Sequence, residues 1–526
     1  MLVSLLLILP FVFAFLMLAS SSKDSSAFRM GLLCFAIPFI LATALVAIGG
    51  QQTDIYPWFS ILGIDIEFSL YGYGLSLWMV WLTTLLSFLA FVYSRDSLSL
   101  GINKFAIGLL ALEGTIIGAF LSAYNIVQFL FFFEAMILPA AILISLHGGL
   151  KRRKAVIIFS IYTLAGSVPL LFGVWYLMVK TGSDNINSLM KTLEVLPLSV
   201  QIPLLIAFSI AFAVKTPVFP FHSWQGITYS EAPYSLSAIL SGAMAKVGVF
   251  GFAIWVIPLF DNLFWNTEYG LCLISLALFS MLYGATLALR QTNIKKLLAF
   301  SSMSHLSLAV AGLFCLDKTV NAGVAVMLVG HGLTAGGLFF FGGIAEKWTG
   351  STNIKRYGAF ASTNPIYATI FGVLGITAIA IPSTVGFVGE FLILRGLFNS
   401  GFVFAVVASV GIILSAAYML RLIKHTLFGP VSNDNTRSDN IYLSQFEGMA
   451  AIPIILMIFY FGLHPAPILN SFKEPTEEGA IELPEYEQIL EEALIIDSLA
   501  REGLIEGDSL AKDSLTIYDL EEQDEH

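Results

Sequence analysis

Ionisable side chains in or beside strongly apolar stretches are the residues of this chain that could do chemistry. Six such residues stand out: Glu134, Lys215, Lys246, His305, His331 and Glu390. An unpaired charge at the centre of a bilayer costs about 2.5–3.5 kcal/mol on insertion scales, so these groups are expected to face one another or water. A buried lysine can release its proton when a nearby carboxylate moves away, and histidine, whose unperturbed pKa is about 6.5, can relay that proton. The set predicts a proton path near the bilayer midplane, in the order Glu134, Lys215, Lys246, His331, His305, Glu390, with Glu113 as a further candidate.

Four of these residues also have a structural interpretation. Lys246 and Glu134 could form an inert ion pair, although a buried pair is no reliable source of stability. His305 follows a basic loop and could serve helix packing, and His331 lies between glycines that let helices approach closely. The number of charges that would have to be buried favours a functional role for the set.

The composition places these residues in a membrane protein. Of the 526 residues, 57% are hydrophobic and 12% are charged, and the mean hydropathy is +0.84. This is too apolar for a soluble domain. Apolar runs of about 20 residues, separated by short polar segments, predict an all-α integral membrane protein rather than a barrel. Fourteen transmembrane helices are predicted, at residues 2–20, 30–49, 76–94, 102–121, 124–146, 154–179, 200–217, 234–258, 269–289, 294–314, 320–345, 365–398 (interrupted), 402–428 and 447–466.

The basic residues predict the orientation of the helices, because Lys and Arg concentrate in the cytoplasmic loops of membrane proteins. The loops after odd-numbered predicted helices hold 17 of the 26 Lys and Arg, and the loops on the other side hold 7. Both termini are therefore predicted on the outer, periplasmic or lumenal side of a bacterial inner membrane or an equivalent energy-transducing membrane.

Two predicted helices are interrupted beside a charge. Pro217 and Pro220 follow Lys215, and Pro382 precedes Glu390. Proline removes a backbone donor, and such breaks are tolerated at membrane depth where they line protein or water. The two breaks are five helices apart, as in transporters built from inverted repeats. The predicted organisation is three N-terminal helices (1–100), a first inverted five-helix repeat (101–260), a second one (261–430), a last helix (431–470) and an acidic C-terminal tail (471–526).

The tail differs from the rest of the chain in charge. It carries 18 Asp and Glu against 3 Lys and Arg, which leaves the membrane part with a net positive charge. Apolar residues at helical spacing between 485 and 499 are compatible with an amphipathic helix that docks on a partner on the outer side. The charge balance favours a solvated acidic tail instead.

The sequence contains no pattern typical of a cofactor, a metal or a nucleic-acid site. Cys34, Cys272 and Cys315 are far apart, and no C-x-x-C pair, phosphate-binding loop or dinucleotide motif is present. The chain is therefore predicted to carry no redox centre and no metal. Its expected partners are lipid and other membrane proteins, and no nucleic acid.

Seven stretches form a recognisable set: Phe131 to Pro139, Ala211 to Trp224, the Lys246 helix, Lys295 to His305, His331 to Leu333, Gly389 to Leu394 and Gly462 to Pro467. Together they resemble the antiporter-like membrane subunits of proton-pumping NADH:quinone oxidoreductase, respiratory complex I, and most closely the NuoM type. The resemblance implies a 14-helix fold with a half-channel in each inverted repeat. Glu134 would partner Lys215, Lys246 would be the central relay, and Glu390 would be the gate toward the outer half-channel.

The resemblance also implies partners. The chain would be a subunit of a translocase, with other antiporter-like membrane subunits as neighbours and with flavin, iron–sulfur clusters and quinone on partner subunits. Glu390 favours the NuoM type, since sister subunits and Mrp-type antiporters often have lysine there. Asn125 and Asn293 depart from the pattern, because the family commonly has acidic residues at both positions.

Three other functions remain open at this point. The first is a cation/proton antiporter subunit of the Mrp type. The second is an energy-coupling membrane subunit of a hydrogenase or of an inorganic-carbon uptake complex. The third is a scaffold without transport, against which the buried charges argue.

Overall fold

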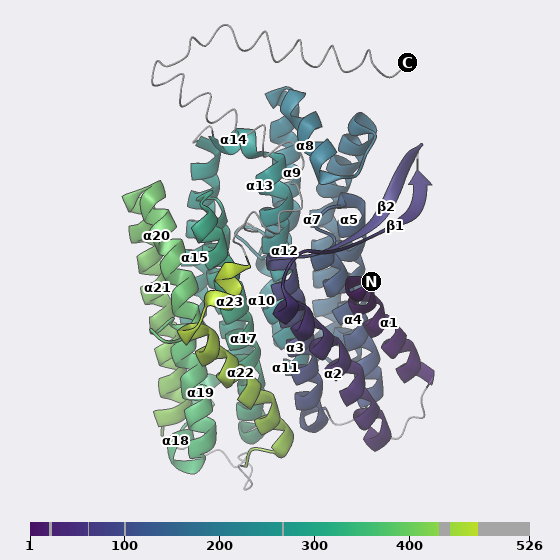
Figure 1. The fold of residues 1–526 in the computed structure, drawn as a ribbon. Coiled ribbons are helices and arrows are strands. Elements are labelled where there is room, and N and C mark those ends of the chain that lie inside the picture. Colours follow the sequence, from purple (N-terminus) through teal and green to yellow (C-terminus); the bar gives the residue numbers. More distant parts are fainter. Residues whose placement is uncertain (20–23, 62, 99–100, 266–267, 431–441, 472–526) are drawn as a thin grey trace, which may run out of the picture. The chain divides into compact units, whose positions relative to one another are not determined.

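The computed structural model describes residues 1–19, 24–61, 63–98, 101–265, 268–430 and 442–471 (Figure 1). The acidic tail, with its predicted amphipathic helix and its predicted docking, lies outside these residues except for Ser471. Among the described residues, 13 helices are long and apolar enough to cross a membrane. The fold is therefore that of a multi-span membrane protein.

The N-terminal part contains three helices and a hairpin: α1 (Leu2–Ala19), α2 (Asp24–Ile48), β1 (Gln52–Ile61), β2 (Ile64–Gly72) and α3 (Leu75–Ser97). The strands pair antiparallel and stand at one edge of the helices in Figure 1. The membrane spans are helical, as predicted, and the hairpin is an addition that the sequence analysis did not predict. Ile64, Ile66 and Leu70 are buried at alternate positions of β2, and this two-residue period is the signal of a half-buried strand.

The middle part holds the first predicted break. Its elements are α4 (Ile102–Leu121), α5 (Ile126–Ala135), α6 (Ile137–His147), α7 (Arg152–Thr181), α8 (Ile186–Val195), α9 (Leu198–Lys215), α10 (Ser223–Glu231), α11 (Tyr234–Ile239), η1 (Leu240–Met244), α12 (Lys246–Gly251), η2 (Phe252–Val256), α13 (Ile257–Leu259) and α14 (Asp261–Trp265). Helix α9 ends at Lys215, and the chain turns through Pro217 and Pro220 before α10 begins. The segments α11 to α13 form one continuous crossing.

The remaining part holds the second break. Its elements are α15 (Glu268–Arg290), α16 (Ile294–Leu313), α17 (Lys318–Thr349), η3 (Ile354–Arg356), α18 (Phe360–Thr363), α19 (Pro365–Ala378), α20 (Val385–Ser400), α21 (Phe402–Ile423), η4 (Lys424–Phe428), α22 (Gln445–Leu463) and α23 (Ala466–Asn470). The interrupted crossing predicted at 365–398 is the pair α19 and α20. Because neither helix alone is long enough to span, the 14 predicted crossings include 13 single spanning helices.

Helix α17 is the longest element, and its ends explain its length. The Asp317 side chain accepts hydrogen bonds from the backbone N–H groups of Thr319 and Val320 at the start. Gly350 ends the helix with a φ of 65°, a left-handed conformation that favours glycine. Between these caps, nearly every residue of α17 is buried. The helix therefore forms the centre of the molecule.

The two asparagines that depart from the family pattern occupy matching local structures. Asn125 caps α5 and pairs with Asn185, while Asn293 caps α16 and pairs with Asn353, each through an antiparallel bridge. In both cases the residue after each asparagine donates its backbone N–H to the carbonyl of the residue before the partner asparagine. Asparagine therefore fills the helix-capping role that aspartate also can fill.

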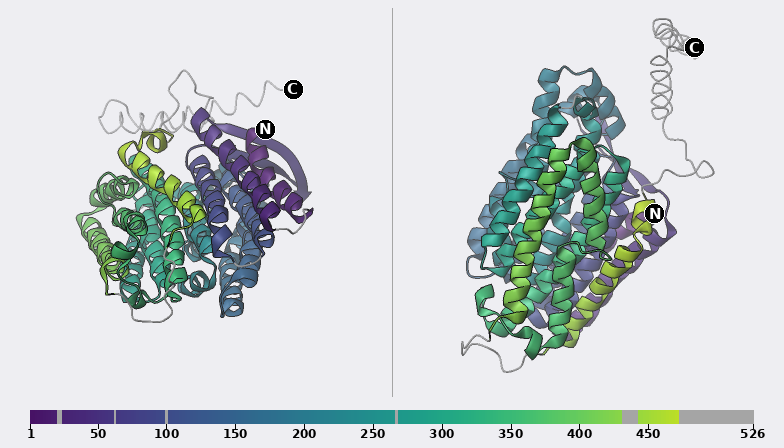
Figure 2. Two further views of the ribbon diagram at one scale, coloured as in Figure 1. Left: turned by 90° about the horizontal axis from the view of Figure 1, so that it is seen from below. Right: turned by 90° about the vertical axis from the view of Figure 1, so that its left-hand side faces the viewer.

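The most enclosed crossings are α3, α16, α17 and the continuous crossing from α11 to α13, whereas α1, α2, α7 and α22 expose many apolar side chains. Helix α22 runs at an angle along the outside of the bundle in both views of Figure 2. Exposed leucine, isoleucine and phenylalanine at spanning depth fit a surface covered by lipid or by other membrane chains. The charged residues predicted to act together must therefore be sought around α16, α17 and the crossing that carries Lys246.

Candidate functional site

The helix that carries Lys246 contains a π-helical turn just before this residue. In the π-helical turn η1, the N–H of Ala245 donates to the carbonyl of Leu240, five residues back, at 3.0 Å. The carbonyl of Ser241 is thereby left to accept a hydrogen bond from Lys246 Nζ at 3.0 Å. Such π turns occur often at functional sites. The local winding thus supplies an acceptor that holds the fully buried ammonium group.

Lys246 also contacts His331 on α17. Its Nζ lies 3.1 Å from His331 Nδ1, which accepts when it carries no proton. The helices come this close because of glycines: a Cβ added to Gly332 would lie 2.9 Å from the carbonyl oxygen of Gly242. The small residues beside His331 therefore position it as well as permit packing.

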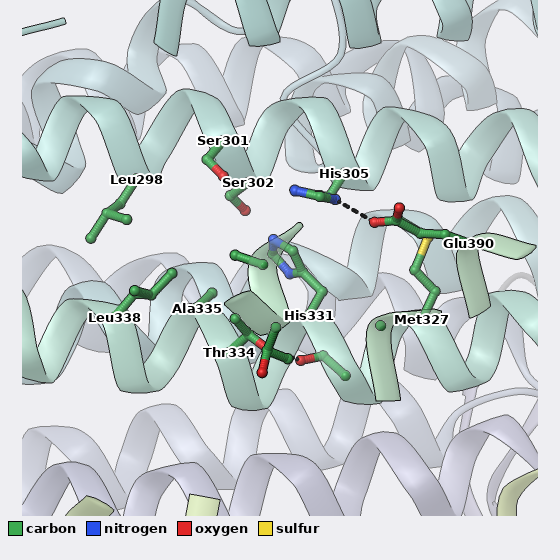
Figure 3. A pocket seen from close by; sticks show the side chains of 14 residues that line it. Leu298, Ser301, Ser302, His305, Met327, His331, Thr334, Ala335, Leu338 and Glu390 are labelled. Carbon is green, nitrogen blue, oxygen red and sulfur yellow. Dashed lines mark hydrogen bonds and ion pairs between the residues drawn. The ribbon is translucent and has the colours of Figure 1, made fainter. Parts of the chain in front are cut away.

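From His331 the polar groups continue to Glu390. The imidazole rings of His331 and His305 have centroids 5.6 Å apart. His305 Nδ1 in turn lies 3.1 Å from Glu390 Oε1, which Figure 3 marks with a dashed line. Glu390 stands on the second turn of α20, so the break between α19 and α20 sets its depth. The structure thus brings together Lys246, His331, His305 and Glu390.

Tyr418 on α21 joins this group and was not predicted from the sequence. Its hydroxyl lies 3.3 Å from His305 Nε2, 2.8 Å from Ser301 Oγ and 3.1 Å from Ser415 Oγ. When His305 Nδ1 donates to Glu390, Nε2 can accept from Tyr418, so both ring nitrogens have partners. Tyrosine is common in membrane helices, and its position alone gave no signal.

A small cavity follows these residues. Its volume is about 30 Å³, and it lies between α16, α17 and the break of α19 and α20. Ser302, Thr334, His331 and Glu390 are among its lining residues (Figure 3). Polar side chains are among its lining residues, and its volume is enough for water, which needs about 10–15 Å³. Water there would link the two histidines, whose rings are tilted by 45° to each other and make no direct hydrogen bond in the described structure.

Lys215 and Glu134 lie at adjoining helix ends. Lys215 Nζ donates to the carbonyl of Phe133 at 3.1 Å and lies 4.6 Å from the centre of the Phe133 ring. The Glu134 carboxylate interacts electrostatically with Lys215. Among the described residues, however, the two do not approach within the 4.0 Å of an ion pair. The expected partnership is therefore a charge interaction over a longer distance.

The segment after Lys215 packs against the Lys246 helix. A Cβ added to Gly248 would lie 2.7 Å from the backbone nitrogen of Thr216 and 2.8 Å from the carbonyl oxygen of Phe212. The buried Thr216 hydroxyl is also in this contact and has no hydrogen-bond partner among the described residues. Lys215 and Lys246 thus sit on segments in direct contact, without a hydrogen bond between their own side chains.

Glu113 stands apart from the other six residues. It is fully buried on α4, and neither carboxylate oxygen has a hydrogen-bond partner among the described residues. Helix α4 contacts both α5, which carries Glu134, and α12, which begins with Lys246. Glu113 therefore stays a candidate because it is buried, but no described contact joins it to the other six residues.

Comparisons with known proteins identify the family to which the sequence is similar. Residues 123–415 match the family described as "NADH:quinone oxidoreductase/Mrp antiporter, TM". Subunit M of NADH-quinone oxidoreductase from Rickettsia prowazekii (strain Madrid E) is 34% identical over 422 residues, which cover 80% of this chain and 85% of the relative.

Solved structures extend the likeness to the fold. A chain of respiratory complex I from Thermus thermophilus with bound NADH has a TM-score of 0.80 and 28% identity, covering 90% of this chain and 98% of that chain. A chain of the Mrp complex from Dietzia sp. DQ12-45-1b has a TM-score of 0.78 at 20% identity, covering 96% of this chain and 56% of that chain, and so shares the fold. The match over more than half of the sequence shows that the chain belongs to the NADH:quinone oxidoreductase/Mrp antiporter transmembrane family.

Proposed function

We propose that the chain is an antiporter-like, proton-translocating subunit of an NADH:quinone oxidoreductase of the complex I type. Protons move along Glu134, Lys215, Lys246, His331, His305 and Glu390 while quinone is reduced on other subunits. The observation that carries the proposal is the succession from Lys246 to Glu390. Two contacts of 3.1 Å flank a pair of neighbouring imidazoles, whose ring centroids are 5.6 Å apart.

The chemistry follows from what each group can hold. Lys246 donates a proton to the neutral Nδ1 of His331, and a neutral imidazole that gains a proton on one nitrogen can release one from the other. Water in the cavity carries the proton to His305. His305 then passes it to Glu390, whose carboxylate oxygen is within direct reach. A change of charge at one site alters the proton affinity of its neighbours. These six residues, called the row below, therefore titrate as a coupled group.

The organisation into two inverted repeats, at 101–260 and 261–430, is part of the proposal. It is supported by the matching asparagine bridges that begin α5 and α16 and by the two helix breaks beside Lys215 and Glu390. The distribution of Lys and Arg supports termini on the outer side of the membrane.

Redox cofactors belong to the partner subunits in this proposal. The relatives are named as subunits of NADH-quinone oxidoreductase, so flavin, iron–sulfur clusters and quinone are expected on other chains. The exposed apolar faces of α1, α2, α7 and α22 fit lipid and neighbouring membrane subunits.

An antiporter of the Mrp type is the second candidate. The fold likeness to the Mrp complex supports it, but at 20% identity that likeness speaks for the fold alone. Glu390, bound to His305, supports the complex I type because the Mrp pattern often places lysine at this position.

Purification of the native assembly through a tag on this chain separates the two functions. The complex I type predicts flavin and iron–sulfur clusters in the assembly, and NADH-driven proton uptake into vesicles that is the same in sodium and potassium media. An assembly without redox cofactors, in which a sodium gradient drives proton movement, would establish the antiporter instead.

A further inference from the structure

Lys295 is a third buried lysine, and the proposed row does not use it. It lies at the start of α16, where its Nζ donates to the carbonyl of Ala232 at 2.9 Å. The same Nζ lies 4.1 Å from the centre of the Tyr234 ring. The Tyr234 hydroxyl donates to Glu346 Oε2 at 2.5 Å. These side chains form a polar cluster at the basic end of the bundle, the end at which α16 begins and α17 ends.

The cluster reaches the surface through the next residue of α17. The Lys347 side chain is 44% exposed, and its Nζ lies 2.9 Å from Glu447 Oε1 on α22. Glu346 also attracts Lys295 electrostatically. An ion pair at the surface thus adjoins Glu346 along α17, and Glu346 attracts a lysine whose burial is costly unless the charge is paired or used.

The cluster lies about one helical turn from the cavity along α16 and α17. Leu298 follows Lys295 by one helical turn and therefore lies on the same face of α16. On α17, Leu338 stands one turn before Gly342, at which an added Cβ would lie 3.1 Å from Ile294 and 3.4 Å from Tyr234. Leu298 and Leu338 also line the cavity, at the end opposite Glu390 in Figure 3. Two leucines thus separate the cluster from the cavity.

Polar groups resume on the inner side of the two leucines. Ser301, Ser302 and Thr334 line the cavity, and Ser302 Oγ accepts a hydrogen bond at 3.0 Å from the hydroxyl of Ser241, the residue whose carbonyl holds Lys246. An apolar constriction between two polar compartments is closed when it holds no water and opens when water enters it. The arrangement therefore has a loading site, a gate and a receiving site in line.

We propose that this column is the route by which protons enter the row from the basic end. Glu346 and Tyr234 take up the proton, and the positive charge of Lys295 holds the Glu346 carboxylate in place. Leu298 and Leu338 form the gate that water must cross to reach His331. The inference rests on the proposed function, since it assigns the entry to that same row.

Thiol labelling tests the gate without requiring transport. Ser302→Cys, in a chain with Cys34, Cys272 and Cys315 changed to alanine, is exposed in vesicles to a membrane-impermeant cationic thiosulfonate on the basic-end side. Labelling is expected to be slow, and about tenfold faster when Leu338→Ala widens the constriction. Equal rates with and without Leu338→Ala, or labelling only from the opposite side, would overturn the proposed gate.

Transport tests the loading site. Glu346→Gln keeps the shape of the side chain but cannot become a carboxylate, and the loss of a positioned proton carrier is expected to slow NADH-driven proton uptake about 10²-fold. Glu268→Gln, an exposed residue at the start of α15, is the matched control and should pump as wild type. If Lys246→Met stops pumping while Glu346→Gln does not change it, the entry route is wrong and the row stands. If Lys246→Met leaves pumping intact, the proposed function itself fails.

Discussion

His331→Phe is expected to reduce NADH-driven proton translocation about 10²-fold or more, because a positioned proton carrier contributes at least this factor. Phenylalanine fills the space of the imidazole but offers no nitrogen to Lys246 Nζ, which lies 3.1 Å from His331 Nδ1. The path between Lys246 and His305 would lose its only described side-chain bridge. The measurement is proton uptake per NADH oxidised in vesicles that contain the purified assembly.

The control for this substitution is His464→Phe. His464 follows α22, away from the row, and packs beside Tyr460. It should keep proton uptake at the wild-type level. Undiminished uptake by His331→Phe, in an assembly of normal subunit composition, would show that protons bypass α17.

Gly248→Ala is expected to disturb both stability and transport. The new Cβ would lie 2.7 Å from the backbone nitrogen of Thr216 and 2.8 Å from the carbonyl oxygen of Phe212. Backbone atoms cannot rotate away as a side chain can, so the end of α9 must shift. Overpacking of this kind costs about 1–3 kcal/mol. Since Lys215 ends α9, its distance from Lys246 must change as well.

Thermal unfolding of the purified assembly and proton uptake per NADH measure the two effects of Gly248→Ala. Gly448→Ala on α22 is a matched control, because an added Cβ there meets nothing within 4 Å and alanine favours a helix over glycine. Gly448→Ala should be neutral or slightly stabilising. A Gly248→Ala assembly with normal stability and uptake would contradict the contact between the Lys246 helix and the break after Lys215.

The spanning helices and both breaks were predictable because their signals are strong in the sequence. Long apolar runs have few alternative structures in lipid, and proline beside a charge marks where a helix stops. The hairpin formed by β1 and β2 was missed because it lies between spans, and a search for apolar runs of 20 residues does not detect short strands. Its alternating buried residues, such as Ile64 and Ile66, were a readable signal at the shorter period.

The members of the candidate row were predictable for a similar reason. A charge within an apolar helix is costly, so Lys246 and Glu390 stand out by residue type alone. Their contacts were not predictable, because sequence gives no distances between helices. The π turn before Lys246 has no residue signature, since it depends on how the Ser241 carbonyl is used by a side chain.

Tyr418 and Lys295 show a second limit of the sequence. Tyrosine in a membrane helix and lysine at a helix end are both ordinary, because such side chains often reach toward the interface. Their roles come from the neighbours that the fold supplies: His305 for Tyr418, and Tyr234 for Lys295. A residue of a common type at a common position can be assigned to a functional site only once its contacts in the fold are known.

Proton uptake per NADH oxidised by Lys246→Arg is the most direct measurement of the central claim, that Lys246 gives up and regains a proton. Arginine keeps the positive charge but stays protonated in proteins. The relay therefore predicts that Lys246→Arg loses proton translocation as fully as Lys246→Met, in an assembly of normal composition. Wild-type uptake by Lys246→Arg, combined with loss in Lys246→Met, would mean that Lys246 acts as a fixed charge and would contradict the relay.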